Sequence, residues 1–468
     1  MSTAARQLLL VVAFGLCWHA LWAASIPGPT QWDSAYTWEV ARNLARGDGA
    51  VTRAVWAVAW LPPDLQHPAD LHWSPLPSRI LVPAMAVWPS WRMTQAVAVL
   101  LAALWGPLGW AWGRRLGLFG TQRVLAGIVA ASGLGALPFL GVPDSVGLFG
   151  LLGGAALLTV AEGRLLATVV LCVLAALSRG DGFLLGLACA AGFTLRRAPW
   201  PALAGTGTAG LWMLRGWLLA GDGFFALRAR VATAGSVGDL LLLQDPAPLG
   251  LGERLVGVLG STPLAAGLFV LEGGVLPVLF GGLALLLRRR DRTLWPVLLL
   301  PPLVLLADFF LAPGVAGQGT TYRTLAAVLP ALAALGLVGA RDVLRDLSPW
   351  LLPGVVAVGG ITLGSLVGVK LHGAFAVGDD CAALAAQGVP AGAPVLAYEP
   401  LHVTARCDHP ALQIPPDATS ADIARLADRY GIVWAVTAPE DHKQAAWRTS
   451  GVAWEGWVRV GERVWRRE

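Results

Sequence analysis

Long apolar stretches dominate this chain and constrain its fold more than any other feature. A helix crosses the hydrocarbon core of a bilayer in about 20 residues, and apolar runs near that length recur along the sequence. We predict eleven spans, at residues 7–26, 93–112, 122–141, 144–161, 164–178, 181–195, 200–220, 263–287, 293–312, 321–339 and 349–370. The pattern predicts an all-α polytopic membrane protein.

The composition excludes several other classes of protein. Of the 468 residues, 56% are hydrophobic and only 13% are charged, whereas a soluble domain has about 25% charged residues. One water-soluble core cannot bury so many apolar residues. An ordinary cytosolic enzyme, a disordered chain and a nucleic-acid-binding protein are therefore excluded.

The positions of the arginines predict the orientation of the spans. Short cytoplasmic loops are enriched in Lys and Arg. If the N-terminus is cytoplasmic, every inner connection carries at least one arginine: Arg6, Arg114, Arg115, Arg123, Arg164, Arg196, Arg197, Arg288, Arg289, Arg290, Arg292, Arg341 and Arg345. The first long loop (27–92) and the tail (371–468) then lie outside the cytoplasm, and we predict a bacterial inner membrane protein.

The tail differs in kind from the rest of the chain. In residues 371–468 the apolar positions are broken by charged residues and proline, which indicates a small soluble α/β domain beside a membrane module at 1–370. A helix is predicted at 420–430 with Ser420 as its N-cap, and a buried strand at 431–436.

Two of the five cysteines, Cys381 and Cys407, lie in this tail. The extracytoplasmic side of a bacterial membrane is oxidising, so a disulfide between them is predicted.

The first outer loop begins with a short polar helix. Apolar positions recur at helical spacing over 34–45, and Gly47 and Gly49 stop the helix. Asp33 therefore lies at the N-terminal end of this helix, just after the first span. Two interpretations remain open: Asp33 is an N-cap, or it is a catalytic carboxylate.

The same loop continues with an aromatic segment that contains histidine and proline. His67 and Pro68 precede the stretch His72-Trp73-Ser74-Pro75-Leu76. Such a segment is typical of an interfacial aromatic belt. It would also suit the wall of a sugar-binding cleft, because an indole face packs well against a pyranose ring.

A second carboxylate, Asp144, opens the fourth span and faces the same side as Asp33. It could be a helix cap, since a helix N-terminus stabilises a carboxylate. Two carboxylates that meet in a cavity at the membrane edge could also hold a metal ion or take a proton from a hydroxyl.

Further charges are predicted at the same depth. Arg179 and Asp181 occupy the turn between the fifth and sixth spans, where they form a structural ion pair or present Arg179 to a phosphate. Ionisable groups in spans are costly and normally face a cavity or a partner; here they are Arg215, Glu272, Asp308 and Arg323.

Taken in order, these motifs resemble the polytopic GT-C glycosyltransferases, above all those related to dolichyl-phosphate-mannose protein mannosyltransferases and bacterial aminoarabinose transferases (glycosyltransferase family 39). The resemblance covers most of residues 7–370. Its motifs are Asp33 and Tyr36 followed by Ala-Arg-Asn-Leu-Ala-x-Gly-x-Gly (41–49), then His72 to Leu76, Asp144, Arg179 to Gly182, and Tyr322 to Pro330.

The resemblance implies transfer of a hexosyl or pentosyl group from a polyprenyl-phosphate-linked donor to an acceptor hydroxyl on the outer face. It implies Asp33 as general base and Asp144 as a second acidic residue that supports the site or binds a divalent cation, Mg²⁺ or Mn²⁺. The other implied substrate-binding residues are Tyr36, His72, Trp73, Arg179, Asp181, Tyr322 and Arg323. Arg179 and Arg323 would bind the phosphate.

The chain departs from the family pattern at Ser34, where many relatives have a second acidic residue, and at Gly180, where they have proline. The first difference puts a metal at that position in doubt. The acceptor stays open among a glycan, a lipid and a protein, and besides the donor we expect contact with membrane lipid and none with nucleic acid. Two alternatives fit the architecture: a transporter or flippase of lipid-linked sugars, and a non-catalytic envelope assembly protein.

Overall fold

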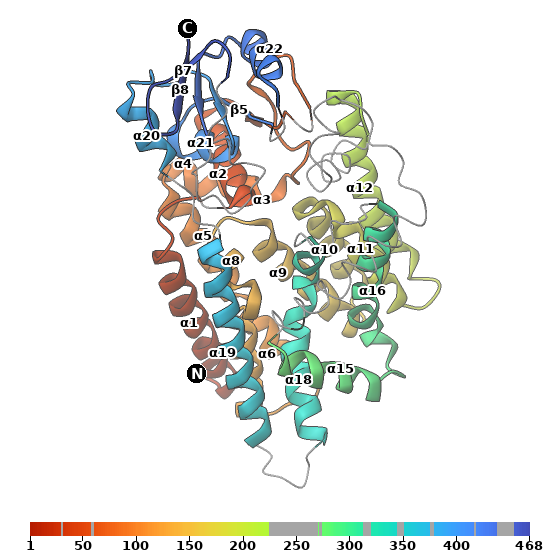
Figure 1. The fold of residues 1–468 in the computed structure, drawn as a ribbon. Helices are drawn as coiled ribbons and strands as arrows, with labels where there is room; N and C mark the ends of the chain where they lie inside the picture. Colours follow the sequence, from red (N-terminus) through yellow and green to blue (C-terminus); the bar gives the residue numbers. More distant parts are fainter. Residues whose placement is uncertain are drawn as a thin grey trace.

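The computed structural model describes residues 1–29, 31–57, 60–223, 270, 274–311, 320–343, 351–374, 379–415, 418–437 and 454–468. Helices form one elongated part of the molecule, and a small sheet with its own helices covers one end of it (Figure 1). The C-terminus lies in this small part, and the first outer loop lies between it and the long helices (Figure 1).

Helices occur at the positions of the predicted spans. They are α1 (Thr3–Ala24), α5 (Trp91–Ala103), α6 (Trp105–Arg115), α7 (Thr121–Ala131), α8 (Leu137–Leu140), α9 (Ser145–Ala161), α10 (Leu165–Ser178), α11 (Phe183–Ala191), α12 (Pro199–Ala220), α15 (Leu276–Leu287), α16 (Trp295–Leu311), α17 (Thr320–Leu325), α18 (Leu329–Val343) and α19 (Leu351–Ala374). Most of 263–275, the first part of the eighth span, lies outside the described residues.

Within the described residues, four stretches are both long and apolar enough to cross a membrane: Thr3–Ala24, Trp91–Arg115, Thr121–Leu140 and Arg323–Val343. The prediction of a mainly helical membrane protein is confirmed. The number of eleven spans stays a prediction, because several of the remaining helices, such as α9 and α10, are shorter than a full crossing.

Close packing between α6 and α9 fixes the start of α9, where Asp144 lies. Trp105 is fully buried, and its indole N–H donates to the carbonyl of Gly147 at 3.1 Å. A Cβ at Gly150 would lie 2.1 Å from the Trp105 ring, so the two helices can approach this closely only because position 150 has no side chain.

The first outer loop contributes α2 (Trp32–Arg46), β1 (Val51–Thr52), β2 (Ala54–Val55), β3 (His67–Pro68), α3 (Leu76–Arg79) and α4 (Val82–Val87). The tail contributes α20 (Asp380–Ala386), β4 (Val395–Ala397), α21 (Pro400–Cys407), β5 (Ala411–Gln413), α22 (Ser420–Tyr430), β6 (Trp434–Val436), β7 (Trp457–Arg459) and β8 (Val464–Arg467).

Six of these eight strands form one sheet in the order β2-β5-β4-β6-β8-β7, and β1 and β3 pair with each other in a separate two-stranded sheet. The first four are parallel, and the last two pair antiparallel. The predicted α/β character of the tail is confirmed. One edge strand, β2, comes from the first outer loop, so the loop and the tail share one sheet. A boundary at residue 371 stays a prediction.

Two details of the tail differ from the sequence prediction. The N-cap of α22 is Thr419 and not Ser420, because Thr419 and Asp422 bond each other's backbone N–H groups in a capping box. The predicted strand at 431–436 is shorter, because Gly431 adopts a left-handed conformation (φ 62°) that ends α22, and β6 begins at Trp434.

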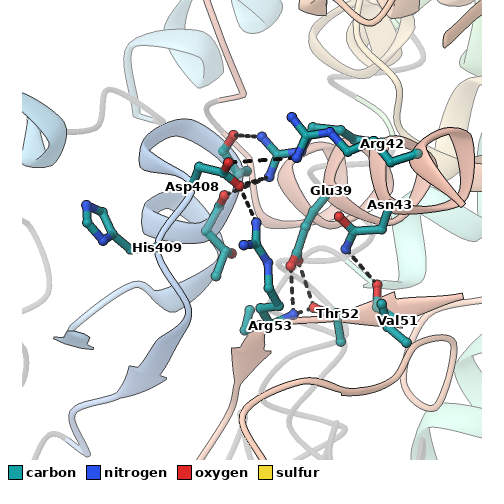
Figure 2. A network of polar contacts seen from close by, with 12 residues as sticks. Glu39, Arg42, Asn43, Val51, Thr52, Arg53, Asp408 and His409 are labelled. Carbon is teal, nitrogen blue, oxygen red and sulfur yellow. Dashed lines mark hydrogen bonds and ion pairs between the residues drawn. The ribbon is translucent and has the colours of Figure 1, made fainter. Parts of the chain in front are cut away.

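A polar network joins the outer loop to the tail (Figure 2). Arg42 of α2 donates to the carbonyls of Thr404 and Ala405 at the end of α21, at 3.1 and 3.3 Å, and to Asp408 at 3.0 Å. Arg53 also pairs with Asp408. These contacts hold the C-terminal half of α2 against the tail.

Glu39 anchors the other side of this network (Figure 2). Its carboxylate is fully buried and accepts hydrogen bonds from the Thr52 hydroxyl and the Arg53 backbone N–H, both at 2.7 Å. Burial raises the pKa of the Glu39 carboxyl, although both hydrogen bonds and the charge of Arg53 oppose this. Glu39 therefore ties α2 to the strand that enters the shared sheet.

The predicted disulfide is present between Cys381 and Cys407 and closes a loop with a sequence separation of 26 residues. It links α20 to the end of α21, next to Asp408. The α21 terminus that holds α2 is thus itself covalently restrained.

We expect the double substitution Cys381→Ser and Cys407→Ser to lower the free energy of unfolding of the tail by about 3.5 kcal/mol. A disulfide that closes a loop of this length restricts the unfolded chain, and the lost entropy corresponds to about that free energy. The measurement is the temperature at which the tail of the purified protein becomes sensitive to protease. Cys17→Ser, which removes a free and exposed thiol, is the matched control. An equal midpoint in the double variant and the control would contradict the expectation.

Candidate functional site

Asp33 lies at the second position of α2 and points away from the helix backbone. The residue that caps α2 is Gln31, and the Ser34 hydroxyl donates to the Gln31 carbonyl at 2.9 Å and accepts from its N–H at 3.4 Å. The interpretation of Asp33 as an N-cap is therefore wrong. The capping contacts also explain a serine at position 34, since the helix start uses its hydroxyl.

Both oxygens of Asp33 accept strong hydrogen bonds. The indole N–H of Trp73 donates to Oδ1 at 2.8 Å, and Arg323 of α17 donates to Oδ2 at 2.9 Å. The Asp33 side chain remains 16% exposed, so it lies at the edge of an accessible space. The predicted residues Asp33, Trp73 and Arg323 are thus brought into direct contact.

This arrangement keeps Asp33 ionised. Burial alone would raise the pKa of the Asp33 carboxyl, but the charge of Arg323, the hydrogen bond from Trp73 and the charges of Arg179 and His72 outweigh burial, so the pKa lies below its ordinary value. At neutral pH the site therefore contains a carboxylate paired with a guanidinium.

Asp144 is the N-cap of α9, and only one of its oxygens is used for capping. Oδ1 accepts from the backbone N–H of Val146 at 2.7 Å, which confirms the cap interpretation for that atom. The residue is 5% exposed. Oδ2 is buried and has no hydrogen-bond partner within the described residues, so it is available to a ligand.

Asp144 lies within electrostatic range of Asp33, Arg323 and Arg179. Contacts also connect the segments of the two aspartates, which are far apart in the sequence: Arg323 pairs with Asp33, its neighbour Thr324 bonds Asp181, and Arg179 bonds Ser145 beside Asp144. The four charged groups come from α2, the start of α9, the turn after α10 and α17, so the fold assembles this site from four separate segments.

Arg179 and Asp181 form a buried bidentate ion pair, with distances of 3.0 and 3.1 Å. The remaining terminal nitrogen of Arg179 donates to the Ser145 hydroxyl at 3.2 Å, and the hydroxyl of Thr324 donates to Asp181. The ion-pair interpretation is therefore confirmed. Asp181 orients Arg179 beside the start of α9, next to Asp144.

Aromatic rings surround the Asp33 carboxylate on the side of the outer loop. Trp73 stacks on Tyr36 with ring centroids 4.4 Å apart. Trp56 packs edge-on against Trp73, with ring centroids 5.6 Å apart, and stacks on His72, with ring centroids 6.5 Å apart. Except for Tyr36, these ring residues are partly exposed.

Tyr36 has a different position from the other predicted substrate-binding residues. It is 3% exposed, and its hydroxyl accepts the backbone N–H of Asp70. The structure therefore turns the Tyr36 hydroxyl inward, where it supports the loop that carries Trp73.

Sequence reasoning missed this supporting loop. Asp70 is buried, has an unusual positive φ of 63° and forms an ion pair with Arg79. Arg215 of α12 donates to the carbonyls of Ala69 and Asp70 at 2.8 and 2.7 Å. Arg215 was visible as a charge in a span, whereas an isolated acidic residue such as Asp70 gave no signal.

Three residues singled out from the sequence cannot be placed fully. Tyr322 belongs to α17 by its backbone, but its side chain and that of Asp308 lie outside the described part of the structure, as does all of Glu272.

The aspartates alone do not fit a divalent cation. Within the described residues, no three acidic, histidine or cysteine side chains gather in a way that could hold a metal ion. Asp144 Oδ2 is open, but both Asp33 oxygens are occupied by Trp73 and Arg323, and Mg²⁺ requires near-octahedral oxygen ligands.

An apolar groove adjoins Asp144. Its cavity volume is only about 20 Å³, and its walls come from α3 and the residues after it, from α5, from the turn between α8 and α9, and from the start of α9. Within the described lining, Asp144 is the only ionisable residue.

No protein-family model and no characterised protein sequence matches this chain. Solved structures of an oligosaccharyltransferase from Archaeoglobus fulgidus do match its fold. The complex with Zn and sulfate has a TM-score of 0.54 and 14% sequence identity, over 92% of this chain and 67% of that one.

The form tethered to an acceptor peptide containing the NVT sequon has a TM-score of 0.56 and 12% identity, over 92% of this chain and 68% of that one. The complex of AglB with an inhibitory peptide and a dolichol-phosphate has a TM-score of 0.54 and 12% identity, over 92% and 69%. The closer resemblance to mannosyltransferases stays a prediction, but the fold of this chain is the GT-C fold of that archaeal oligosaccharyltransferase.

Proposed function

We propose that this protein is a membrane glycosyltransferase that moves a sugar from a polyprenyl-phosphate-linked donor to an acceptor hydroxyl on the extracytoplasmic face. The observation that carries the proposal is the convergence of Asp33, Asp144, Arg179 and Arg323 beside an accessible aromatic cluster. A carboxylate base and two guanidinium groups at one place are what transfer from a lipid phosphate requires.

The reaction forms a bond between the acceptor oxygen and the anomeric carbon, and it breaks the bond from that carbon to the phosphate oxygen. The hydroxyl proton goes to Asp33, which acts as general base. The phosphate leaves with the electron pair of the broken bond, and Arg323 and Arg179 stabilise its charge. His72 and Trp73 contact the sugar, and Asp181 keeps Arg179 in position.

Because Asp33 is paired with Arg323, the pKa of Asp33 depends on whether the donor is bound. A donor phosphate competes with Asp33 for Arg323, because phosphate is a good bidentate partner for guanidinium. When Arg323 turns toward the phosphate, Asp33 loses its nearest positive charge and its pKa rises. Asp33 thereby becomes a stronger base when the donor is bound.

The lipid nature of the donor has two supports. One structural neighbour is solved with a dolichol-phosphate, and the site of this chain lies where membrane helices meet the outer loop. The arginine pattern of the inner connections supports an extracytoplasmic site and a location in the bacterial inner membrane. The aspartates alone do not form a metal site, but one neighbour is solved with Zn and sulfate, so transfer measured with and without Mg²⁺ or Mn²⁺ tests whether a cation takes part.

We expect Asp33→Asn to lower kcat for sugar transfer by about 100-fold or more, since general-base catalysis contributes on the order of 10²–10⁴. Asp144→Asn should also abolish most transfer, because it removes the charge beside the acceptor. The assay is transfer of radiolabelled sugar by purified protein. Asp48→Asn, at an exposed position of the same loop, is the control.

Full activity in both site variants would remove the assignment of Asp33 and Asp144. Movement of intact donor without a change in its covalent structure would indicate a transporter.

Removal of the positive charge at position 323 should change the pH dependence of transfer. In the free enzyme Arg323 holds the pKa of Asp33 low, so kcat/KM declines only when acidic conditions protonate the carboxylate. In Arg323→Gln this acidic limb should move to higher pH. The matched control is Arg406→Gln, at an exposed position of the tail. If the acidic limb of the kcat/KM profile lies at the same pH in wild type and in Arg323→Gln, Asp33 is not the titrating base.

A further inference from the structure

Arg215 places a charge on an end of α12 that is otherwise apolar and exposed. Trp217 and Leu218, close to it on the helix, are exposed apolar side chains, and 200–220 is one of the predicted spans. An ionisable group in such a segment is costly unless it faces a partner. The Arg215 guanidinium lies over the ring of Trp212, 5.3 Å from its centroid. Its hydrogen-bond partners lie in the outer loop, at residues 69 and 70.

Side chains from three helices hold the turn of the outer loop at Asp70. Arg215 of α12 donates to the carbonyls of Ala69 and Asp70, at 2.8 and 2.7 Å. The Asp70 backbone N–H donates to the Tyr36 hydroxyl of α2, and the Asp70 carboxylate pairs with Arg79 of α3. Asp70 has a φ of 63°, a left-handed conformation that a residue other than glycine keeps only where its surroundings hold it. Arg215 therefore helps to fix the direction in which the chain leaves this turn.

The chain that leaves the turn carries Trp73 to Asp33. Trp73 stacks on the ring of Tyr36, with centroids 4.4 Å apart, and donates its indole N–H to Asp33 Oδ1 at 2.8 Å. Tyr36 thus contacts both the turn and the indole. Only two residues separate Trp73 from Asp70, so a displacement of the turn moves the indole relative to the carboxylate.

The groups that influence the ionisation of Asp33 come from every side of it. They are Arg323 of α17, Arg179 after α10, Asp144 at the start of α9, and Trp73 and His72 of the outer loop. Burial raises the pKa of the Asp33 carboxyl, and the charge of Arg323 and the hydrogen bond from Trp73 lower it. Loss of the Trp73 hydrogen bond would make the carboxylate easier to protonate.

We propose that Arg215 is a positioning residue of the site, which fixes the turn at Asp70 and thereby keeps the Trp73 indole bonded to Asp33. The inference rests on the proposed function and deepens it, because it assigns control of the proton acceptor to a residue of α12. Both terminal nitrogens of Arg215 bind the turn, so its effect on Asp33 passes through Trp73.

The test replaces Arg215 by Met in the purified full-length protein, which keeps a long side chain and removes the donors. The acidic limb of kcat/KM for sugar transfer, which reports the free enzyme, should move to higher pH by about 0.5–1 unit. This is the shift expected when one hydrogen bond to the carboxylate is lost. Arg215→Lys retains a charged donor and should restore part of the shift. If Arg215→Met does not accumulate, Arg215→Gln gives the same measurement.

A double-mutant cycle with Trp73→Phe separates positioning from the direct effect of a lost positive charge. Trp73→Phe removes the indole N–H and should itself move the limb to higher pH. In this background Arg215→Met should cause no further shift, because the bond that it loosens is already absent. Arg92→Met is the matched control. The Arg92 guanidinium also donates to two backbone carbonyls, those of Ala23 and Ile26 at 3.0 and 3.3 Å, and its loss should leave the limb in place.

Hydrogen exchange at residues 66–76 is the second measurement, and it needs no turnover. It should become faster in Arg215→Met, since the turn has lost two hydrogen bonds. Unchanged exchange, an acidic limb at the wild-type pH, or an equal shift with and without the Trp73 indole would each overturn the proposal. Sugar transfer that depends on Asp33 would survive all three results. Full activity of Asp33→Asn, or a wild-type protein that transfers no sugar, would refute the proposed function itself and the positioning role with it.

Discussion

The ion pair between Asp33 and Arg323 connects parts of the chain that are 290 residues apart. It joins the first outer loop to one of the last membrane helices, and Trp73 fixes the other oxygen of the same carboxylate. A pair with little solvent around it is not by itself a strong source of stability, because desolvation offsets much of the attraction. Its consequence is positional: the orientation of the Asp33 side chain depends on α17 as well as on α2.

The opposite half of α2 is held by the tail. Arg42 and Arg53 converge on Asp408 (Figure 2), and the disulfide at Cys407 restrains the end of α21 beside it. The small domain and the outer loop also share a sheet through β2. The tail therefore supports the helix that carries the proposed base, whatever further part it has in binding.

The sequence was sufficient for the parts of the molecule that a bilayer dictates. The apolar runs located the helices, and helix-stop glycines such as Gly47 located the end of α2. Asp33, Asp144, Arg179 and Arg323 could be selected because ionisable groups near spans are rare. The partners of these residues could not be predicted: Arg179 donates to Ser145 and Arg323 lies over the ring of Phe139, and both are ordinary residue types whose importance depends on long-range packing. The role of β2 was equally hidden, because two residues give no strand signal and its partner β5 lies at the other end of the chain.

The charges of the site place a condition on donor binding. Asp33, Asp144 and Asp181 carry three negative charges when ionised, and Arg179 and Arg323 carry two positive ones. The proposed lipid-phosphate donor would add a further negative charge to this site, where unbalanced charge is costly. A proton or a cation taken up with the donor would offset this charge. Donor binding and proton or cation uptake are consequently linked equilibria, and the affinity for the donor depends on the concentration of the ion that accompanies it.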